Sequence, residues 1–191
     1  MNILFVSACS RKKSRTKFLA QYLLSKLHGN VTERDLTQTV LLPFTEESVE
    51  QRARFIYQAD FSHPLFALAK EFASADKIVI AAPVWDLSFP SLLKLYIEHI
   101  NVLGITFSYQ ANGKPRGLCK AKQLYYVTTA GGPILNDAYG YGYVQALARQ
   151  FYAIPNTYCL KAENLDIDGA DTESILRQAK RTIDELFAPE Q

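Results

Sequence analysis

The chain has 191 residues, of which 48% are hydrophobic and 21% charged, and its formal net charge is +2. This composition is typical of a folded domain, and the small net charge gives no reason to infer a nucleic-acid-binding protein. Cys9, Cys119 and Cys159 are far apart and lack metal-ligand spacing, so we expect free thiols, no metal site and a cytoplasmic protein without a membrane span.

Apolar runs alternate with amphipathic stretches along the whole chain. Short continuous apolar runs predict strands that are covered on both faces, and apolar residues at helical spacing predict helices. In chain order we predict a strand over 2–8, a helix over 15–27, a weakly marked strand over 31–36, one or two helices within 46–58 and 61–75, a strand over 77–82, a helix over 90–102, a hairpin over 105–119, a strand over 122–128, a helix over 141–153, a strand over 156–162 and a helix over 171–187.

The order of these elements predicts an α/β fold. Alternating strands and helices are typical of a parallel sheet with helices on both faces. Five strands in a chain of this length predict a flavodoxin-like three-layer sandwich with strand order 2-1-3-4-5. The hairpin over 105–119 is an excursion from this pattern, indicated by the turn signal Asn112-Gly113. We expect residues 1–191 to form a single domain.

In such a sheet, ligands bind beyond the C-terminal ends of the strands, which directs attention to the loops there. The loop over 9–17 leads into a helix and carries the hydroxyls of Ser10, Ser14 and Thr16. A helix N-terminus with nearby hydroxyls favours a phosphate group. The same loop holds a cluster of basic residues: Arg11, Lys12, Lys13, Arg15 and Lys17. The alternatives are helix capping by Ser14 or Thr16 and a solvated basic loop.

Two further loops lie at the same predicted edge. In the loop over 82–90, Trp85 is placed to cover a flat ring, with the backbone N–H groups of 85–87 bonding its polar edge. The alternative is that Trp85 and Phe89 pack in the core. In the loop over 128–133, Gly131 and Gly132 allow a close approach of the backbone to a ligand or a positive φ, and a plain turn is the alternative.

A tyrosine-rich segment follows the third loop. Tyr139, Tyr141 and Tyr143 alternate with glycines. This arrangement is consistent with the wall of a pocket for flat aromatic molecules, and a surface turn is the alternative.

The residues of these loops resemble the FMN-dependent NADH azoreductases and NAD(P)H quinone oxidoreductases of the flavodoxin-like superfamily. Ser14–Leu19 matches the family's Ser-x-Ser-x-x-Leu motif, with Thr in place of the second Ser. Ala82–Pro90 corresponds to Ala-Pro-Met-Tyr-Asn-Phe-x-Ile-Pro, and Thr129–Gly132 corresponds to Ser-Arg-Gly-Gly. The hairpin over 105–119 is also similar to that of the family. The sequence departs from the family motifs at two positions: Asp86 stands in place of an Asn, and Ala130 stands in place of an Arg.

This resemblance implies FMN as the cofactor, NADH or NADPH as the electron donor, and a quinone or azo compound as the acceptor. The FMN phosphate would be held by Ser10 (or Cys9, if the motif is aligned differently), Ser14, Arg15 and Thr16. The rest of the cofactor would contact Pro83, Val84, Trp85, Asp86, Leu87, Thr129, Ala130, Gly131 and Gly132. No side chain is expected to act as a general acid. The resemblance further implies a homodimer with the acceptor site at the subunit boundary.

Other functions are compatible with the same cofactor. A non-enzymatic flavodoxin-type electron carrier is one, although the net charge of +2 argues against it because such carriers tend to be acidic. An NAD(P)H-dependent FMN reductase is a second. A different alternative, which uses no flavin, is an anion- or nucleic-acid-binding module that uses the basic loop.

Overall fold

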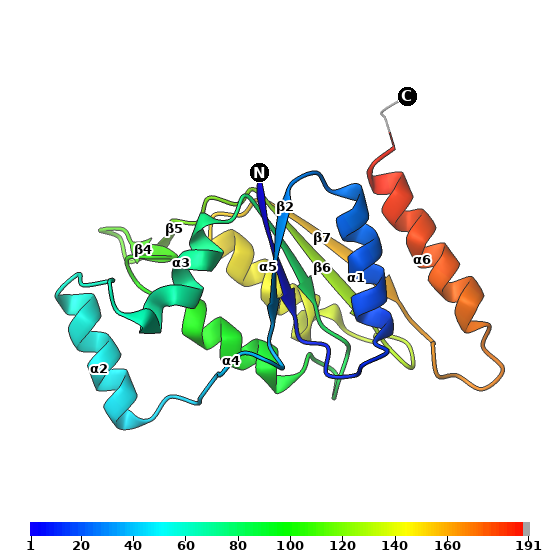
Figure 1. The fold of residues 1–191 in the computed structure, drawn as a ribbon, viewed down its shortest axis with the longest axis horizontal. Helices are drawn as coiled ribbons and strands as arrows, with labels where there is room; N and C mark the ends of the chain where they lie inside the picture. Colours follow the sequence, from blue (N-terminus) through cyan, green and yellow to red (C-terminus); the bar gives the residue numbers. More distant parts are fainter. Residues whose placement is uncertain (189–191) are drawn as a thin grey trace.

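In the computed structural model, which describes residues 1–188, one parallel sheet forms the centre of the molecule (Figure 1). Its strand order is β2-β1-β3-β6-β7. Since β6 and β7 are the fourth and fifth strands of this sheet along the chain, the predicted order 2-1-3-4-5 is confirmed. The strands are β1 (Asn2–Ser7), β2 (Asn30–Asp35), β3 (Lys77–Ala81), β6 (Gln123–Thr129) and β7 (Asn156–Ala162). In the register, Ser7 lies opposite both Asp35 and Ala81, and Thr129 lies opposite Ala162. The C-terminal ends of the strands are therefore close to level, which gathers their loops at one edge.

The helices follow the predicted positions closely. They are α1 (Arg15–Lys26), α2 (Glu46–Tyr57), α3 (Ala67–Ser74), α4 (Ser91–Ile100), α5 (Tyr141–Gln150) and α6 (Thr172–Leu186), with short 3₁₀ turns η1 (Pro64–Phe66) and η2 (Asp137–Tyr139). The segment predicted over 61–75 begins as η1 because Pro64 suits a first turn. Within the described chain, no helix combines the length and the apolar character needed to cross a membrane.

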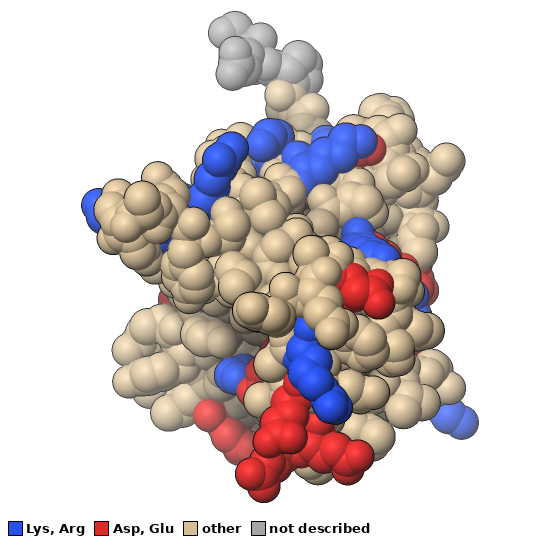
Figure 2. All heavy atoms as spheres, turned by 90° about the vertical axis from the view of Figure 1, so that its left-hand side faces the viewer, with Lys and Arg blue, Asp and Glu red and all other residues tan. Residues whose placement is uncertain are grey.

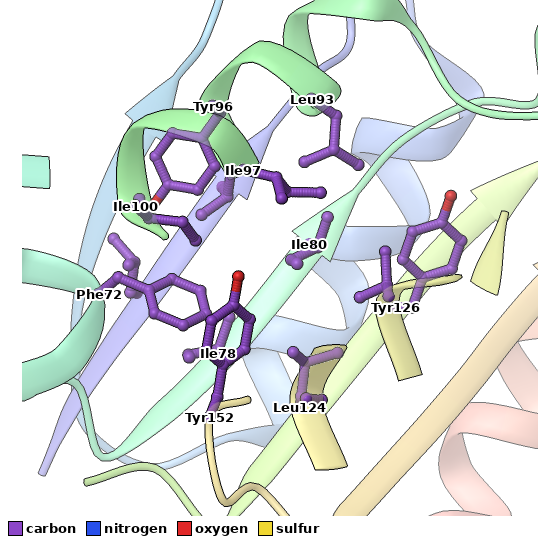
Figure 3. Packing of buried hydrophobic residues seen from close by; sticks show 14 of the residues in the cluster. Phe72, Ile78, Ile80, Leu93, Tyr96, Ile97, Ile100, Leu124, Tyr126 and Tyr152 are labelled. Atoms are coloured by element: carbon purple, nitrogen blue, oxygen red, sulfur yellow. The ribbon is translucent and has the colours of Figure 1, made fainter. Parts of the chain in front are cut away.

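Two helical layers cover the sheet, as Figure 1 shows, with α1 and α6 on one face and α3, α4 and α5 on the other. The side chains of β1, β3 and β6 are buried on both faces, which explains their continuous apolar sequences. Figure 3 shows the larger core, where side chains of β3 and β6 meet those of α4. Its members include Phe72, Ile78, Ile80, Leu93, Tyr96, Ile97, Ile100, Leu124, Tyr126 and Tyr152.

Helix α2 differs from the others because none of its residues is buried. It begins with a capping box in which Thr45 and Ser48 exchange hydrogen bonds. Phe55 packs near its C-terminal end, where its ring stacks on His63 at 4.6 Å. Figure 1 places α2 at the far left, away from the sheet, and Tyr57 at its end is 93% exposed. The surface of α2 is therefore largely uncovered by the rest of the described chain.

The predicted hairpin is confirmed as β4 (Phe107–Tyr109) and β5 (Pro115–Gly117), which pair antiparallel. Its turn has Gly113 at φ +77° and a hydrogen bond from the Gly113 N–H to the Gln110 carbonyl. This is a longer turn than a two-residue Asn-Gly turn, although it still depends on glycine in the left-handed region. The hairpin packs on the end of α5, where a Cβ at Gly117 would lie 2.2 Å from the Ala153 nitrogen.

Candidate functional site

A cleft opens at the C-terminal edge of the sheet, where the loops after β1, β3 and β6 meet. It is lined by Ser10, Arg11, Lys13, Ser14, Arg15, Thr16, Pro83, Val84, Trp85, Thr129, Ala130, Gly131, Leu165 and Asp166. Every residue predicted to bind the cofactor lies in this lining except Asp86, Leu87 and Gly132. The structure therefore brings three separately identified loops into one site.

The first loop forms the end of the cleft at the N-terminus of α1. Ser14 is the N-cap of this helix, and its Oγ accepts a hydrogen bond from the Lys17 N–H at 3.2 Å. The expected alternative of helix capping by Ser14 is thus correct, but Ser14 also lines the cleft, and its hydroxyl proton remains available. The N–H groups of Arg15 and Thr16 have no acceptor within residues 1–188. This end of the cleft offers several donors to an anion.

Ser10 and Cys9, the two candidates for one phosphate contact, have different surroundings. Ser10 is exposed and lines the cleft. Cys9 is buried below it, and its thiol donates to the Ala81 carbonyl at 3.6 Å. Burial raises the pKa of the Cys9 thiol, so this side chain stays neutral near pH 7. Ser10 is the residue of this pair that is positioned to contact a ligand.

A buried pair of hydroxyls joins the first loop to the third. Thr16 Oγ1 lies 2.6 Å from Thr129 Oγ1, and the two residues are 1% and 8% exposed. Helix capping by Thr16, one of the alternatives from the sequence, is therefore wrong. Two hydroxyls carry two protons, and the bond between them uses only one. The pair both ties the loops together and retains one proton to donate at the cleft.

Two of the basic residues near the cleft are held by acidic partners. Arg15 Nη2 lies 2.5 Å from Asp166 Oδ1, and Arg15 Nη1 donates to the Leu165 carbonyl at 2.9 Å. Lys17 Nζ lies 2.6 Å from Glu33 Oε1, and this contact raises the pKa of Lys17. Arg15, predicted to hold a phosphate, thus lines the cleft while bound to its rim.

The second loop makes a tight turn over residues 85–88. The N–H of Trp85 donates to the Ser88 carbonyl at 3.0 Å, and the Ser88 N–H donates to the Trp85 carbonyl at 2.8 Å. Asp86 and Leu87 between them have φ of +49° and +68°. This is the geometry of a type I′ turn, which usually requires glycine or asparagine. Each non-glycine residue in this region costs about 1–2 kcal/mol, so the turn holds backbone strain beside the cleft.

The turn corrects part of the sequence-based hypothesis. The Trp85 N–H does not face a ligand, because it is bonded to Ser88. The Asp86 and Leu87 N–H groups have no acceptor in the described part of the chain, so two of the three expected donors remain. The Trp85 side chain is 43% exposed and lines the cleft, so core packing is wrong for Trp85. Core packing is correct for Phe89, which lies against the larger core.

The third loop contains the two glycines, and neither of them has a positive φ. A Cβ at Gly131 would lie 2.6 Å from Asp166 Oδ2, so a larger residue there would displace the Asp166 side chain. Gly132 faces open space and does not line the cleft. Gly131 therefore lies close to Asp166, and its close approach to a ligand stays a prediction, whereas the alternative of a plain turn fits Gly132.

Comparison with known proteins identifies the family. A family described as the flavodoxin-like fold matches residues 1–186. The chain belongs to the flavodoxin-like fold family. It is 34% identical to the FMN-dependent NADH:quinone oxidoreductase 2 of Clostridium acetobutylicum over 92% of each chain. It is 31% identical to the FMN-dependent NADH:quinone oxidoreductase of Coprothermobacter proteolyticus over 96% of each chain.

Solved structures support the same fold assignment. The azoreductase from Bacillus anthracis strain Sterne superposes with a TM-score of 0.80 over 98% of each chain, at 22% identity. An FMN-dependent NADH-azoreductase from Bacillus anthracis strain Ames Ancestor, solved in complex with FMN, gives a TM-score of 0.80 over 97% of each chain, at 19% identity. At this level of identity the likeness establishes the flavodoxin-like fold.

An aromatic groove lies next to the cleft of this flavodoxin-like protein. It is lined by Asp86, Leu87, Ser88, Phe89, Lys94, Ala138, Tyr139 and Tyr143. Ser88 Oγ donates to the Tyr139 carbonyl at 2.5 Å, which fixes the strained turn to the tyrosine-rich segment. Tyr141 faces the sheet instead, with its hydroxyl donating to the Thr157 carbonyl at 3.0 Å. Two of the three tyrosines thus wall a groove, and the turn separates that groove from the cleft.

Sequence reasoning missed a fourth loop of this flavodoxin-like site. Leu165 and Asp166, in the loop after β7, line the cleft beside the N-terminus of α1. The Asp166 N–H donates to the Gly131 carbonyl at 2.9 Å, which fixes the fourth loop to the third. The rule that ligands bind beyond the strand ends applies to this loop as well, and following it to the last strand would have included these residues.

Proposed function

We propose that this protein is an FMN-dependent oxidoreductase that takes electrons from NADH or NADPH and reduces quinone or azo acceptors. The observation that carries the proposal is the cleft itself. One end combines a helix N-terminus with free hydroxyls, and the other end presents an exposed indole beside two turns of backbone. Such a site matches a molecule with a phosphate at one end and a flat ring at the other.

The phosphate end of FMN fits the donors at α1. Ser10, Ser14 and the N–H groups of Arg15 and Thr16 would hold the phosphate, with the helix dipole favouring its negative charge. Arg15 adds a positive charge at the rim while it stays bonded to Asp166.

The ring end fits the second and third loops. Pro83, Val84 and Trp85 would lie along the ring, and the free N–H groups of Asp86 and Leu87 would meet its polar edge. Thr129 to Gly131 would form the opposite wall, with Gly132 beyond it. Bound there, FMN supplies two-electron transfer between a reduced nicotinamide and an acceptor that takes its place in turn. The role of the chain is to bind, orient and shield, because no general acid is assigned to it.

The relatives support this proposal. Proteins that match this chain over nine-tenths of its length are named FMN-dependent NADH:quinone oxidoreductases. The aromatic groove beside the cleft, walled by Phe89, Tyr139 and Tyr143, offers an apolar surface for a flat acceptor.

Steady-state kinetics test the proposal. Purified protein loaded with FMN should oxidise NADH or NADPH continuously in the presence of menadione and no other protein. Double-reciprocal plots of the initial rate against NADH or NADPH concentration should give parallel lines at several fixed menadione concentrations. This pattern is expected when the donor and the acceptor use one site in turn. A protein that binds FMN but turns over only with a partner protein would be an electron carrier. A protein that reduces added free FMN but not menadione would be a flavin reductase.

We also propose that the protein forms a homodimer through the face that carries α2. Val40, Leu42, Val49 and Tyr57 are exposed there, and α2 has no buried residue. Figure 2 shows this face with a group of acidic side chains at its lower end, a row of basic ones along its upper end and, between them, mostly uncharged side chains with a few charged ones. A two-fold axis across the face would bring the acidic end of one copy against the basic end of the other.

Sedimentation velocity tests the homodimer. The wild-type protein should sediment as a dimer, and Val49→Asp/Tyr57→Asp should sediment as a monomer with an unchanged circular dichroism spectrum. Ile167→Asp, a change at another exposed apolar residue, serves as the control and should remain dimeric. A monomeric wild-type protein would contradict the proposal. We further propose a single domain and a cytoplasmic location, in keeping with three free cysteines.

A further inference from the structure

The aromatic groove beside the cleft has the size and the walls of a binding site for a flat molecule. Its volume is about 560 Å³, which lies within the range typical of small-molecule sites. The ring centroids of Phe89 and Tyr143 lie 5.8 Å apart, and Leu87 and Tyr139 are 65% and 55% exposed. A flat apolar ligand would therefore cover side chains that are otherwise open to solvent.

Asp86 lines this groove and does not line the cleft. The sequence predicted Asp86 as a cofactor contact, but among the two sites it borders only the groove. It belongs to the 85–88 turn, which separates the two sites, so Asp86 lies where a ligand would pass if it extended from the flavin ring into the groove. Its carboxylate is exposed and has no hydrogen-bond or ion-pair partner within residues 1–188.

The other charges of the groove leave the carboxylate of Asp86 uncompensated. Within the described chain, Lys94 is the one cation of the lining, and its Nζ is bonded to Glu98. The remaining lining residues are uncharged. Together with Glu98, the groove thus carries one net negative charge. An anionic group placed there would meet repulsion and find no free cation.

We propose that Asp86 selects the acceptor by its charge. The groove takes the part of a flat acceptor that extends beyond the flavin ring, and it favours uncharged or cationic acceptors over sulfonated or carboxylated ones. The inference rests on the proposed function and specifies its substrate class. An unpaired like charge beside a binding site is sufficient to discriminate against an anion. Asp86 is thus a specificity-determining residue that takes no part in the electron transfer itself.

Acceptor kinetics are the first test. Three dyes share the skeleton of 4-(dimethylamino)azobenzene and carry a carboxylate, a carboxamide or a trimethylammonium group at the 4′ position. When donor and acceptor use one site in turn, kcat/KM for the acceptor depends only on its reaction with the reduced protein, so changes in donor binding do not enter.

The Asp86→Asn variant should change the ratios of these kcat/KM values. The carboxylate dye should gain about fivefold relative to the carboxamide dye, and the trimethylammonium dye should lose a similar factor, as expected for one solvent-screened charge at close range. Asp168→Asn serves as the matched control, because Asp168 is also an exposed aspartate and lines neither the cleft nor the groove. Both ratios should keep their wild-type values in the control.

Ligand binding is the second test and involves no turnover. Naphthalene-2-sulfonate and naphthalene-2-sulfonamide share one ring system and have similar sizes, and only the sulfonate is charged at neutral pH. Calorimetric titration of oxidised, FMN-loaded protein gives the ratio of their affinities. This ratio should shift about fivefold toward the sulfonate in Asp86→Asn and stay unchanged in Asp168→Asn. Added salt should reduce the shift, because Asp86 is exposed.

The outcomes separate this inference from the proposed function. Equal dye ratios in the wild type and in Asp86→Asn, or no binding of the sulfonamide, contradict the inference and leave the proposed function standing. A variant that changes all three dyes by the same factor and shifts the midpoint potential of bound FMN assigns Asp86 to the flavin ring, which also overturns the inference. A protein that reduces neither menadione nor any of the dyes contradicts the proposed function and the inference with it.

Discussion

The two ends of the cleft are built by opposite means. At the phosphate end, a regularly capped helix, a hydroxyl pair and exposed serine and arginine side chains keep ordinary backbone geometry. At the ring end, the 85–88 turn places an aspartate and a leucine in the left-handed region. The first end gains its binding groups from features that also stabilise the fold, whereas the second end includes a turn with backbone strain.

The ring end thus has binding groups at a position where the backbone is strained. Strained, non-glycine turns persist when the surrounding structure fixes them, and here the Ser88 hydroxyl fixes the turn to Tyr139. The Asp86 and Leu87 N–H groups in this turn have no acceptor in the described residues, so they remain available for a ligand. The four predictions below test the two ends in order of expected effect.

The largest effect is expected at the phosphate end from Ser10→Glu. A carboxylate about 4 Å from a phosphate costs about 4 kcal/mol at an effective dielectric constant near 20, and solvent at this exposed position reduces that. The FMN dissociation constant, measured by quenching of flavin fluorescence, should rise about a hundredfold or more. Ser10→Gln has a similar size and no charge, and it should change the constant by less than about tenfold. Equal effects of the two variants would show that charge is not the cause.

The hydroxyl pair provides the second prediction. Thr129→Val should lower the free energy of unfolding by about 1–3 kcal/mol, because the Thr16 hydroxyl is left buried without its partner. Thr16→Val should cost a similar amount. The double variant should be more stable than the sum of the single effects predicts, since both polar groups are gone. Urea denaturation of the four proteins measures the coupling, and strict additivity would contradict the hydrogen bond.

At the ring end, Leu87→Gly should stabilise the protein. Relief of the positive φ is worth about 1–2 kcal/mol, partly offset by the greater chain entropy of glycine when unfolded, so a net gain of about 0.5–1 kcal/mol is expected. FMN should bind less tightly because the turn becomes looser. Ala59→Gly relieves a positive φ of 52° away from the cleft and should stabilise without changing FMN affinity. A destabilised Leu87→Gly protein would contradict the strain at the turn.

The smallest effect is expected from Asp166→Asn, which removes the carboxylate bound to Arg15. The pair is partly exposed, with 30% of the Arg15 and 59% of the Asp166 side chain accessible, so its loss should cost at most about 1 kcal/mol of stability. Arg15 then turns fully to the phosphate, and FMN should bind about two- to fivefold more tightly. Weaker FMN binding would show instead that Asp166 holds Arg15 in the orientation that binds.

The sheet and its order were predictable because β1, β3 and β6 are buried on both faces, which leaves a continuous apolar signal in the sequence. The edge strand β2 is mostly exposed and was correspondingly weakly marked. The phosphate end was predictable as well, since a capping serine and clustered hydroxyls are local features.

The remaining features depend on contacts between distant residues. Arg15 and Asp166 are 151 positions apart, so no local pattern shows that they meet. The Asp-Leu pair in the 85–88 turn does not match the Asn-Gly signature of a type I′ turn, so the strained turn was not predictable. The exposure of Trp85 likewise follows from how the turn lies on the fold, and composition alone favoured burial.

In the proposed complex, the N-terminus of α1 binds the phosphate of a flavin whose ring lies against the 85–88 turn. Titration of the protein with FMN and with riboflavin tests it directly, because the two ligands share the ring and differ in the phosphate. We expect one FMN bound per chain, and riboflavin bound more weakly by about a hundredfold or more. Equal affinity for the two ligands, or binding of neither, would contradict it.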